Sequence, residues 1–200
     1  MNQWLWLLWG LLAVVAFFFL TLAPEVELGD TPATTVVLDE PDILMENANI
    51  TQFEADGNRE YRLHAKEIRH FDAKNLTRLA DPELTMYQQN RPPWIAKSRK
   101  GYIRRETAQD GHVEEIVLLR EAVELERIQP GIRGVHLGSE LMYIYPARQY
   151  AESTQPVTID TTTGRTVAQN MTADFKKGRI HMYSGKNQRV HTIVLPDQFE

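Results

Sequence analysis

Hydrophobic and polar residues divide the chain into two parts with different patterns. From Trp4 to Ala23, WLWLLWGLLAVVAFFFLTLA, twenty consecutive residues carry no charge. A helix of this length extends about 30 Å, which matches the hydrocarbon core of a bilayer. Trp4, Trp6 and Trp9 crowd one end, where indole rings favour the headgroup boundary. The pattern predicts that residues 1–23 form a transmembrane anchor.

A cleaved signal peptide is the alternative for this segment, because Thr21-Leu22-Ala23 resembles a small-residue cleavage site. The apolar run exceeds the usual 7–15 residues of a signal peptide, and no Lys or Arg precedes it, which favours a retained anchor. The short end holds three residues, and the first basic residue of the chain is Arg59. We therefore expect a single pass with the N-terminus in the cytoplasm and the long polar part exported.

Behind the anchor, residues 24–41 predict an extended linker, since the segment holds three prolines and no basic residue. The following stretch PDILMENA, residues 41–48, has a faintly helical or irregular pattern. We assign residues 42–200 to one exported domain.

From Ile50 onward, apolar and polar residues alternate with a period of two, which is typical of half-buried strands. Val117, Leu119, Val123 and Leu125 share one face of EIVLLREAVELERI. No later segment repeats with a helical period. The pattern predicts an all-β domain.

A phrase of the form apolar-x-apolar-x-small-x-x-apolar recurs along this domain. Its copies are Tyr61-Leu63-Ala65-Ile68, Trp94-Ala96-Ser98-Gly101, Val135-Leu137-Ser139-Met142 and a weaker one at Met171-Ala173. The extra residue after the small position changes the parity of the strand, as a bulge or a bend does. Such bends let a sheet fold over into a two-sheet roll with an open apolar interior. A closed β-sandwich filled by its own side chains explains the repeat equally well.

Composition excludes several functional classes. The net charge is −5 with acids and bases interleaved, so the basic surface that nucleic acid requires is absent. The chain has no cysteine, which excludes disulfides and thiol chemistry. None of the six histidines has a metal-ligand spacing, and no serine or glycine motif of an enzyme occurs. We predict no metal, no cofactor and no enzymatic activity.

Two local features leave alternatives open. The parity of Glu121 places it among apolar residues, where a carboxylate without a basic partner is costly, so we expect a bulge or strand end that exposes it to water. Three sequons begin at Asn49, Asn75 and Asn170. These sequons would be functional under an alternative hypothesis, in which the chain is a secreted, glycosylated β-protein that loses residues 1–23.

The order of these segments resembles the LptC family of the Gram-negative lipopolysaccharide export machinery. The resemblance covers nearly the whole chain and rests on the span followed by PDILMENANITQFEADGNREYRLHAKEIRHF, DPELTMY, PPWIAKSRKGYIRR, EEIVLLREAVELERI, LGSELMYIYP and TADFKKGRIHMYS. The chain departs from the family twice. Glu121-Ala122 stands where the family usually has Gly-Asn, and Gln169-Asn170 replaces glycines near the last repeat.

The resemblance implies a periplasmic β-jellyroll on an inner-membrane anchor. It implies that the domain accepts lipopolysaccharide from a transporter formed by LptB, LptF and LptG and passes it to an LptA-like bridge protein. The N-terminal edge and the transmembrane helix would face the transporter. The C-terminal edge would pair with the bridge protein by β-augmentation, and the residues we assign to this edge are Ala173, Phe175, Ile180, Met182 and Val190.

An apolar path through the domain would shield acyl chains from water, since burying each CH₂ is worth about 0.8 kcal/mol. The residues we expect to line it are Tyr61, Leu63, Ile68, Leu84, Met86, Trp94, Ile103, Val117, Leu119, Val123, Val135, Leu137, Met142, Ile144, Met171 and Ile180. Many of them would equally serve as plain core. A membrane-tethered scaffold or adhesion domain without lipid transport is the alternative function.

Overall fold

The structure is a computed structural model that describes residues 40–107, 111, 113–129, 132–186 and 188–194. The predicted anchor and all but the last two residues of the predicted linker lie outside these ranges. Among the described residues, no helix has the length and apolar character needed to cross a membrane.

The described part is built from antiparallel strands, which confirms the all-β prediction. In chain order the strands are β1 (Ile43–Phe53), β2 (Arg59–Phe71), β3 (Leu76–Ala80), β4 (Glu83–Gln88), β5 (Arg91–Lys97), β6 (Lys100–Thr107), β7 (Val113–Gln129), β8 (Ile132–Tyr145), β9 (Tyr150–Ser153), β10 (Val157–Thr161), β11 (Gly164–Ala168), β12 (Asn170–Asp174), β13 (Arg179–Tyr183) and β14 (His191–Val194). A short 3-10 turn, η1 (Asp72–Lys74), links β2 to β3.

The interpretation of residues 41–48 as helical or irregular is wrong, because β1 begins at Ile43 and pairs along the length of β2. Met45, Ala48 and Ile50 of β1 pack against the core, while the residues between them face solvent. Met45 and Ala48 are three residues apart, and Ala48 and Ile50 are two apart. The alternation with a period of two is therefore interrupted within β1.

Three long strands pass from one layer of the fold to a second layer. In β2, residues 67–71 pair with β3 and residues 61–64 pair with β4. In β7, residues 113–120 pair with β6 and residues 124–126 pair with β5. In β8, residues 143–145 pair with β9 and residues 136–139 pair with β10. One sheet is thereby folded over onto itself.

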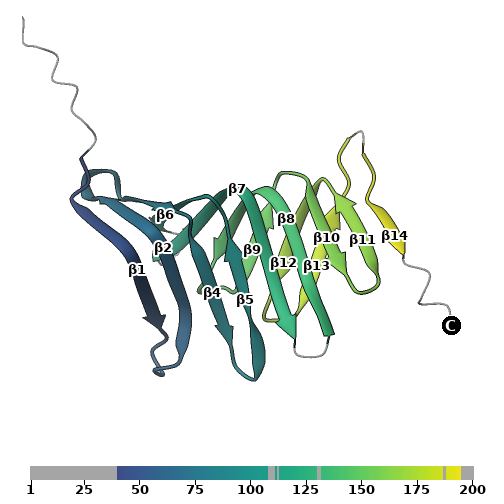
Figure 1. The fold of residues 1–200 in the computed structure, drawn as a ribbon, viewed down its shortest axis with the longest axis horizontal. Coiled ribbons are helices and arrows are strands. Elements are labelled where there is room, and N and C mark those ends of the chain that lie inside the picture. Colours follow the sequence, from purple (N-terminus) through teal and green to yellow (C-terminus); the bar gives the residue numbers. More distant parts are fainter. Residues whose placement is uncertain (1–39, 108–110, 112, 130–131, 187, 195–200) are drawn as a thin grey trace, which may run out of the picture. The chain divides into compact units, whose positions relative to one another are not determined.

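Each layer can be followed from β1 toward the C-terminal strands (Figure 1). The first layer has the order β1-β2-β3-β6-β7-β8-β9-β12-β13, and the second has the order β1-β2-β4-β5-β7-β8-β10-β11-β14. Side chains from the two inner faces form one apolar interior between the layers. This is the folded-over roll, one of the two architectures that the repeat left open, with β13 and β14 at its C-terminal edges.

The strands change layer along a row of bends that we call the corner line. Its backbone takes left-handed φ values at Asn47 (48°), Asp81 (48°), Glu121 (65°) and Ala122 (52°). Backbone hydrogen bonds join neighbouring bends, for example from Asp81 N to Arg99 O (2.9 Å) and from Arg99 N to Glu121 O (3.0 Å). The corner line is therefore closed by main-chain contacts.

The small residues of the first three repeat copies, Ala65, Ser98 and Ser139, lie beside these bends, as predicted. The fourth copy differs. Its small residue, Ala173, lies inside β12, and the bend of this strand falls at Gln169, whose N–H donates to Tyr183 O (3.1 Å).

Candidate functional site

The interior of the roll holds every residue that the sequence placed along an apolar path. Thirteen of the sixteen are buried, and Ile103, Val135 and Ile180 are half-buried and pack against them. Contact of these side chains with lipid stays a prediction. The structure establishes that they form one cluster between the two layers.

The side of the roll opposite the corner line, which we call the mouth, is closed by side chains. The Tyr61 hydroxyl in the second layer donates to Glu115 Oε1 in the first layer at 2.5 Å. The Arg105 guanidinium lies 3.6 Å from the other oxygen of Glu115. Burial, together with the neighbouring Glu115 carboxylate, holds the pKa of the Tyr61 hydroxyl well above its usual range.

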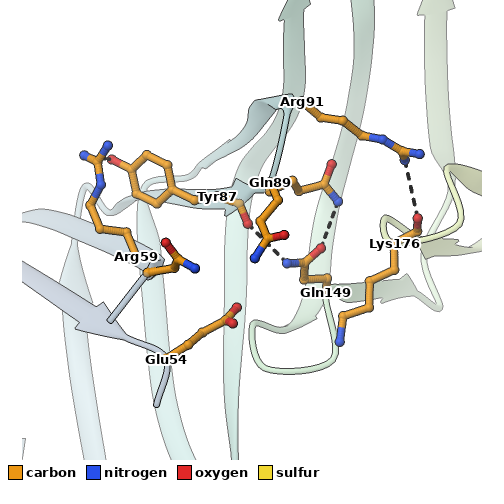
Figure 2. A pocket seen from close by; sticks show the side chains of 9 residues that line it. Glu54, Arg59, Tyr87, Gln89, Arg91, Gln149 and Lys176 are labelled. Carbon is orange, nitrogen blue, oxygen red and sulfur yellow. Dashed lines mark hydrogen bonds between the residues drawn. The ribbon is translucent and has the colours of Figure 1, made fainter. Parts of the chain in front are cut away.

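A second bridge across the mouth is built from two glutamines (Figure 2). Gln88 Nε2 donates to Gln149 Oε1 and to Phe175 O, both at 2.9 Å. Gln149 Nε2 donates in turn to Tyr87 O at 3.1 Å. The Phe175 ring, held beneath this bridge, lies 4.8 Å from the ring of Trp94. Side-chain hydrogen bonds thus cover the apolar interior here.

Outside this bridge lies a polar cavity of about 570 Å³. Figure 2 shows Arg59, Arg91, Lys176 and Glu54 around it. The Arg59 guanidinium lies 4.3 Å from the ring centroid of Tyr87, and Arg91 donates to Lys176 O at 3.4 Å. With three cations and one carboxylate, this surface suits an anionic group.

Two smaller cavities enter the interior at its ends. The β1 cavity, of about 250 Å³, is lined by residues that include Met45, Ile50 and Ile103. The β13 cavity, of about 270 Å³, is lined by Trp94, Arg127, Gly134, Val135, Thr161, Thr162, Asp174, Phe175, Gly178, Arg179 and Ile180. Between the two ends the interior is filled by fully buried leucines, namely Leu84, Leu119, Leu125 and Leu137. The roll therefore has a cavity at each end and fully buried side chains between them.

Of the five residues assigned to the C-terminal partner edge, three lie on or beside the edge strands and two lie in the interior. Ile180 and Met182 lie half-buried on β13, and Val190 lies half-buried just before β14. Ala173 and Phe175 are buried in the interior. Within the described residues β13 pairs only with β12, and β14 only with β11, so each strand offers an unpaired side.

The structure also adds residues that the sequence reasoning missed. Glu115 and Arg127 sit on β7 with the same parity as its inward-facing apolar residues, one near each end of the strand. A polar residue on an inward parity was the signal that could have found both. Gln88 and Gln149 are 61 residues apart in the chain, and no local pattern connects them.

Glu121 lies where the sequence predicted. Its side chain is 46% exposed at the corner line, and its carboxylate is 2.7 Å from Lys100 Nζ. In the described ranges, no group of three or more His, Cys, Asp or Glu side chains is arranged to hold a metal ion.

Comparisons with known proteins agree with this architecture. A solved structure with the same fold is LptH, described as the LptA homologous periplasmic component of the conserved lipopolysaccharide transport device from Pseudomonas aeruginosa. It superposes with a TM-score of 0.52 at 8% identity, covering 68% of this chain and 95% of LptH. Among curated protein sequences, none matches this chain.

The family comparison extends over most of the sequence. The model of lipopolysaccharide-assembly, LptC-related proteins matches residues 9–190, which include strands β1 to β13 and most of the apolar N-terminal segment. The chain belongs to this LptC-related family of lipopolysaccharide-assembly proteins.

Proposed function

We propose that the roll carries the acyl chains of lipopolysaccharide through its interior as a non-enzymatic step of lipopolysaccharide transport. The observation that carries the proposal is the single apolar cluster between the layers, with a cavity at each end. Acyl chains need continuous shielding from water, and an interior that runs from one edge of the roll to the other supplies it.

The buried residues at the centre of the interior limit how a lipid can pass through the roll. Leu84, Leu119, Leu125 and Leu137 are fully buried between the two end cavities, and we infer that their side chains occupy the space that an acyl chain would need. The layers must therefore separate at the mouth for a lipid to pass. The mouth is held by two side-chain bridges, whereas the corner line is held by backbone, so separation hinges at the corner line.

The anionic sugar head would remain outside the mouth. The polar cavity with Arg59, Arg91 and Lys176 lies directly over the glutamine bridge, and its excess of cations supports this placement. The tails would then point inward past Phe175, between the two layers.

The proposed partners are inferred from the two exposed edges of the roll and from the family to which the chain belongs. The N-terminal edge at β1 and a transmembrane helix within residues 1–23 would receive lipid from an inner-membrane LptB–LptF–LptG complex. The C-terminal edge at β13 and β14 would pass it to an LptA-like bridge protein. The unpaired sides of β13 and β14 support β-augmentation, because an exposed strand edge is a pairing surface.

Site-specific photo-crosslinking tests the interior path. Ile103 and Val135 are suitable probe sites, since they line the end cavities and are half-buried, so they tolerate a bulky photoreactive side chain better than the buried residues. Arg62 and His181 are exposed controls on β2 and β13. We expect capture of lipopolysaccharide at the two cavity sites and none at the controls.

Equal capture at cavity sites and controls would contradict the interior path and favour a scaffold domain. Crosslinking in cells that contain the transporter and the bridge protein, with probes on the unpaired sides of β1 and β13, tests the two partner edges separately.

A further inference from the structure

Three buried side-chain atoms among the described residues have no hydrogen-bond partner, and two of them line the same cavity. They are Trp94 Nε1 and Arg127 Nε, both on the wall of the β13 cavity. Both atoms are donors. A buried donor without an acceptor is costly, so such an atom calls for an explanation.

The backbone aims both side chains inward. Trp94 lies on β5, opposite Met86 of β4, and only 3% of its surface is exposed. Arg127 follows Val123 and Leu125 on the inner face of β7, opposite Val135. The Arg127 guanidinium carbon is 5.6 Å from the Trp94 ring centroid. This cation–π contact stabilises the charge, but it provides no acceptor for either N–H.

Asp174, the acidic residue on the wall of the cavity, already binds Lys177. Asp174 Oδ1 accepts from Lys177 N at 3.0 Å, and its Oδ2 lies 3.0 Å from Lys177 Nζ. These contacts lower the pKa of Asp174, so it stays ionised within its own turn. Arg127 and Arg179 then leave the cavity with an excess of positive charge.

The remaining wall is apolar, with Val135, Phe175 and Ile180. A ligand that fits such a wall carries an apolar chain that ends in acceptor oxygens, and the positive charge favours an anionic or strongly polarised acceptor. We propose that the β13 cavity is a subsite for the junction between an acyl chain and its polar head, where Arg127 and Trp94 donate to acyl-linkage or phosphate oxygens. This assignment rests on the proposed function and names the part of the lipid that stops there.

The test measures lipopolysaccharide affinity and stability in the same variants of the full-length protein in nanodiscs. Arg127→Met keeps the aliphatic stem without donors, and Trp94→Phe keeps a ring without its N–H. Arg120→Met, on the exposed outer face of the same strand, is the matched control. We expect a dissociation constant raised about tenfold or more by Arg127→Met and about fivefold by Trp94→Phe. The control should leave it unchanged.

The thermal midpoint of the lipid-free protein separates binding from a structural role. Arg127→Met removes a donor that has no partner and should leave this midpoint unchanged or raise it. Trp94→Phe also removes buried ring volume and should lower the midpoint modestly. If both variants bind with wild-type affinity, or if they lose thermal stability while their affinity stays unchanged, the subsite is overturned and lipid transport still stands. If the wild-type protein does not bind lipopolysaccharide, both proposals fail.

Lipopolysaccharide stripped of its phosphate groups identifies the acceptor. A penalty of Arg127→Met that disappears with this lipid assigns the subsite to phosphate. A penalty that persists assigns it to the acyl-linkage carbonyls. A double variant whose effect is smaller than the product of the single effects would show that both donors serve one group.

Discussion

The corner line and the mouth are the two long sides of the same roll, and they are closed by different kinds of contact. At the corner line, continuous strands bend from one layer to the other, and backbone hydrogen bonds join the bends. At the mouth, the described residues of the two layers are joined by hydrogen bonds whose donors are side chains, at Tyr61–Glu115 and around the Gln88–Gln149 pair.

The difference locates where the roll can open. Separating the layers at the corner line would break strands and their ladders. Separating them at the mouth breaks a few side-chain hydrogen bonds, each worth about 1 kcal/mol, and contacts of the apolar interior that an entering acyl chain would replace. A lipid carrier needs this asymmetry, since one side must stay closed while the other admits a tail.

The largest loss of stability is expected from damage to the corner line. Buried Ser153 donates to Leu141 O at 2.7 Å and accepts from Gln155 N at 3.1 Å where β9 passes toward β10. Ser153→Val keeps the shape and removes both of these hydrogen bonds, while Leu141 O keeps a single side-chain donor, Ser139 Oγ at 3.2 Å. We expect the free energy of unfolding to fall by about 2 kcal/mol. Urea denaturation measures it, with exposed Thr154→Val as the control.

A mouth variant should have a smaller effect on overall stability and a larger one on local opening. Gln149→Ala removes the bonds to Gln88 and to Tyr87 O, and we expect a loss of about 1 kcal/mol. Hydrogen exchange should accelerate around residues 87–91, and lipopolysaccharide uptake should become faster. Gln89→Ala, on an exposed neighbour, is the control. Unchanged exchange in Gln149→Ala would mean that the glutamine bridge does not hold the mouth.

Relieving backbone strain at the corner line should stabilise the protein modestly. Ala122 has a φ of 52°, which costs an L-residue free energy and costs glycine none. We expect Ala122→Gly to raise the free energy of unfolding by up to about 1 kcal/mol. Ala147→Gly, at an exposed turn alanine outside the left-handed region, should give no gain. A similar gain in both variants would show that corner strain is not the cause.

The smallest expected effect on stability at neutral pH comes from two tyrosines, Tyr145 at the end of β8 and Tyr61 at the mouth. Burial and the Glu152 carboxylate raise the pKa of Tyr145 to about 12, and the pKa of Tyr61 is raised further. The folded state therefore holds these protons more tightly than the unfolded state. The stability they contribute is complete below pH 10, where unfolded tyrosine is still protonated, and falls as the pH rises through 12.

Urea denaturation between pH 7 and pH 11 checks this direction. Tyr61→Phe should show a shallower loss of stability above pH 10 than the wild-type protein, and Tyr145→Phe a smaller change of the same sign. An unchanged slope in Tyr61→Phe would exclude the Tyr61–Glu115 bridge as its source.

Local features of the sequence predicted the corners. Ala65, Ser98 and Ser139 were recognisable because a small residue fits a close bend and the parity of the strand changes just after it. The same reasoning failed at Ala173, where the bend lies four residues earlier, at Gln169. It also failed at β1, an edge strand whose bend at Asn47 interrupts the alternation.

Glu121 and Ala122, which stand where the resemblance leads us to expect a Gly-Asn pair, both have positive φ. Glycine and asparagine adopt this conformation most readily. The chain keeps the bend with less suitable residues, and Lys100 pairs with Glu121 beside it.

The strands after β1, the inward-facing residues and the family were predictable from the sequence, because each depends on alternation, spacing and order along the chain. How the mouth closes and which residues line the end cavities became visible in the folded structure alone. The Gln88–Gln149 bridge and the meeting of Trp94 with Arg127 join residues 61 and 33 positions apart. Contacts of that range depend on how two layers are folded over each other, which no local period encodes.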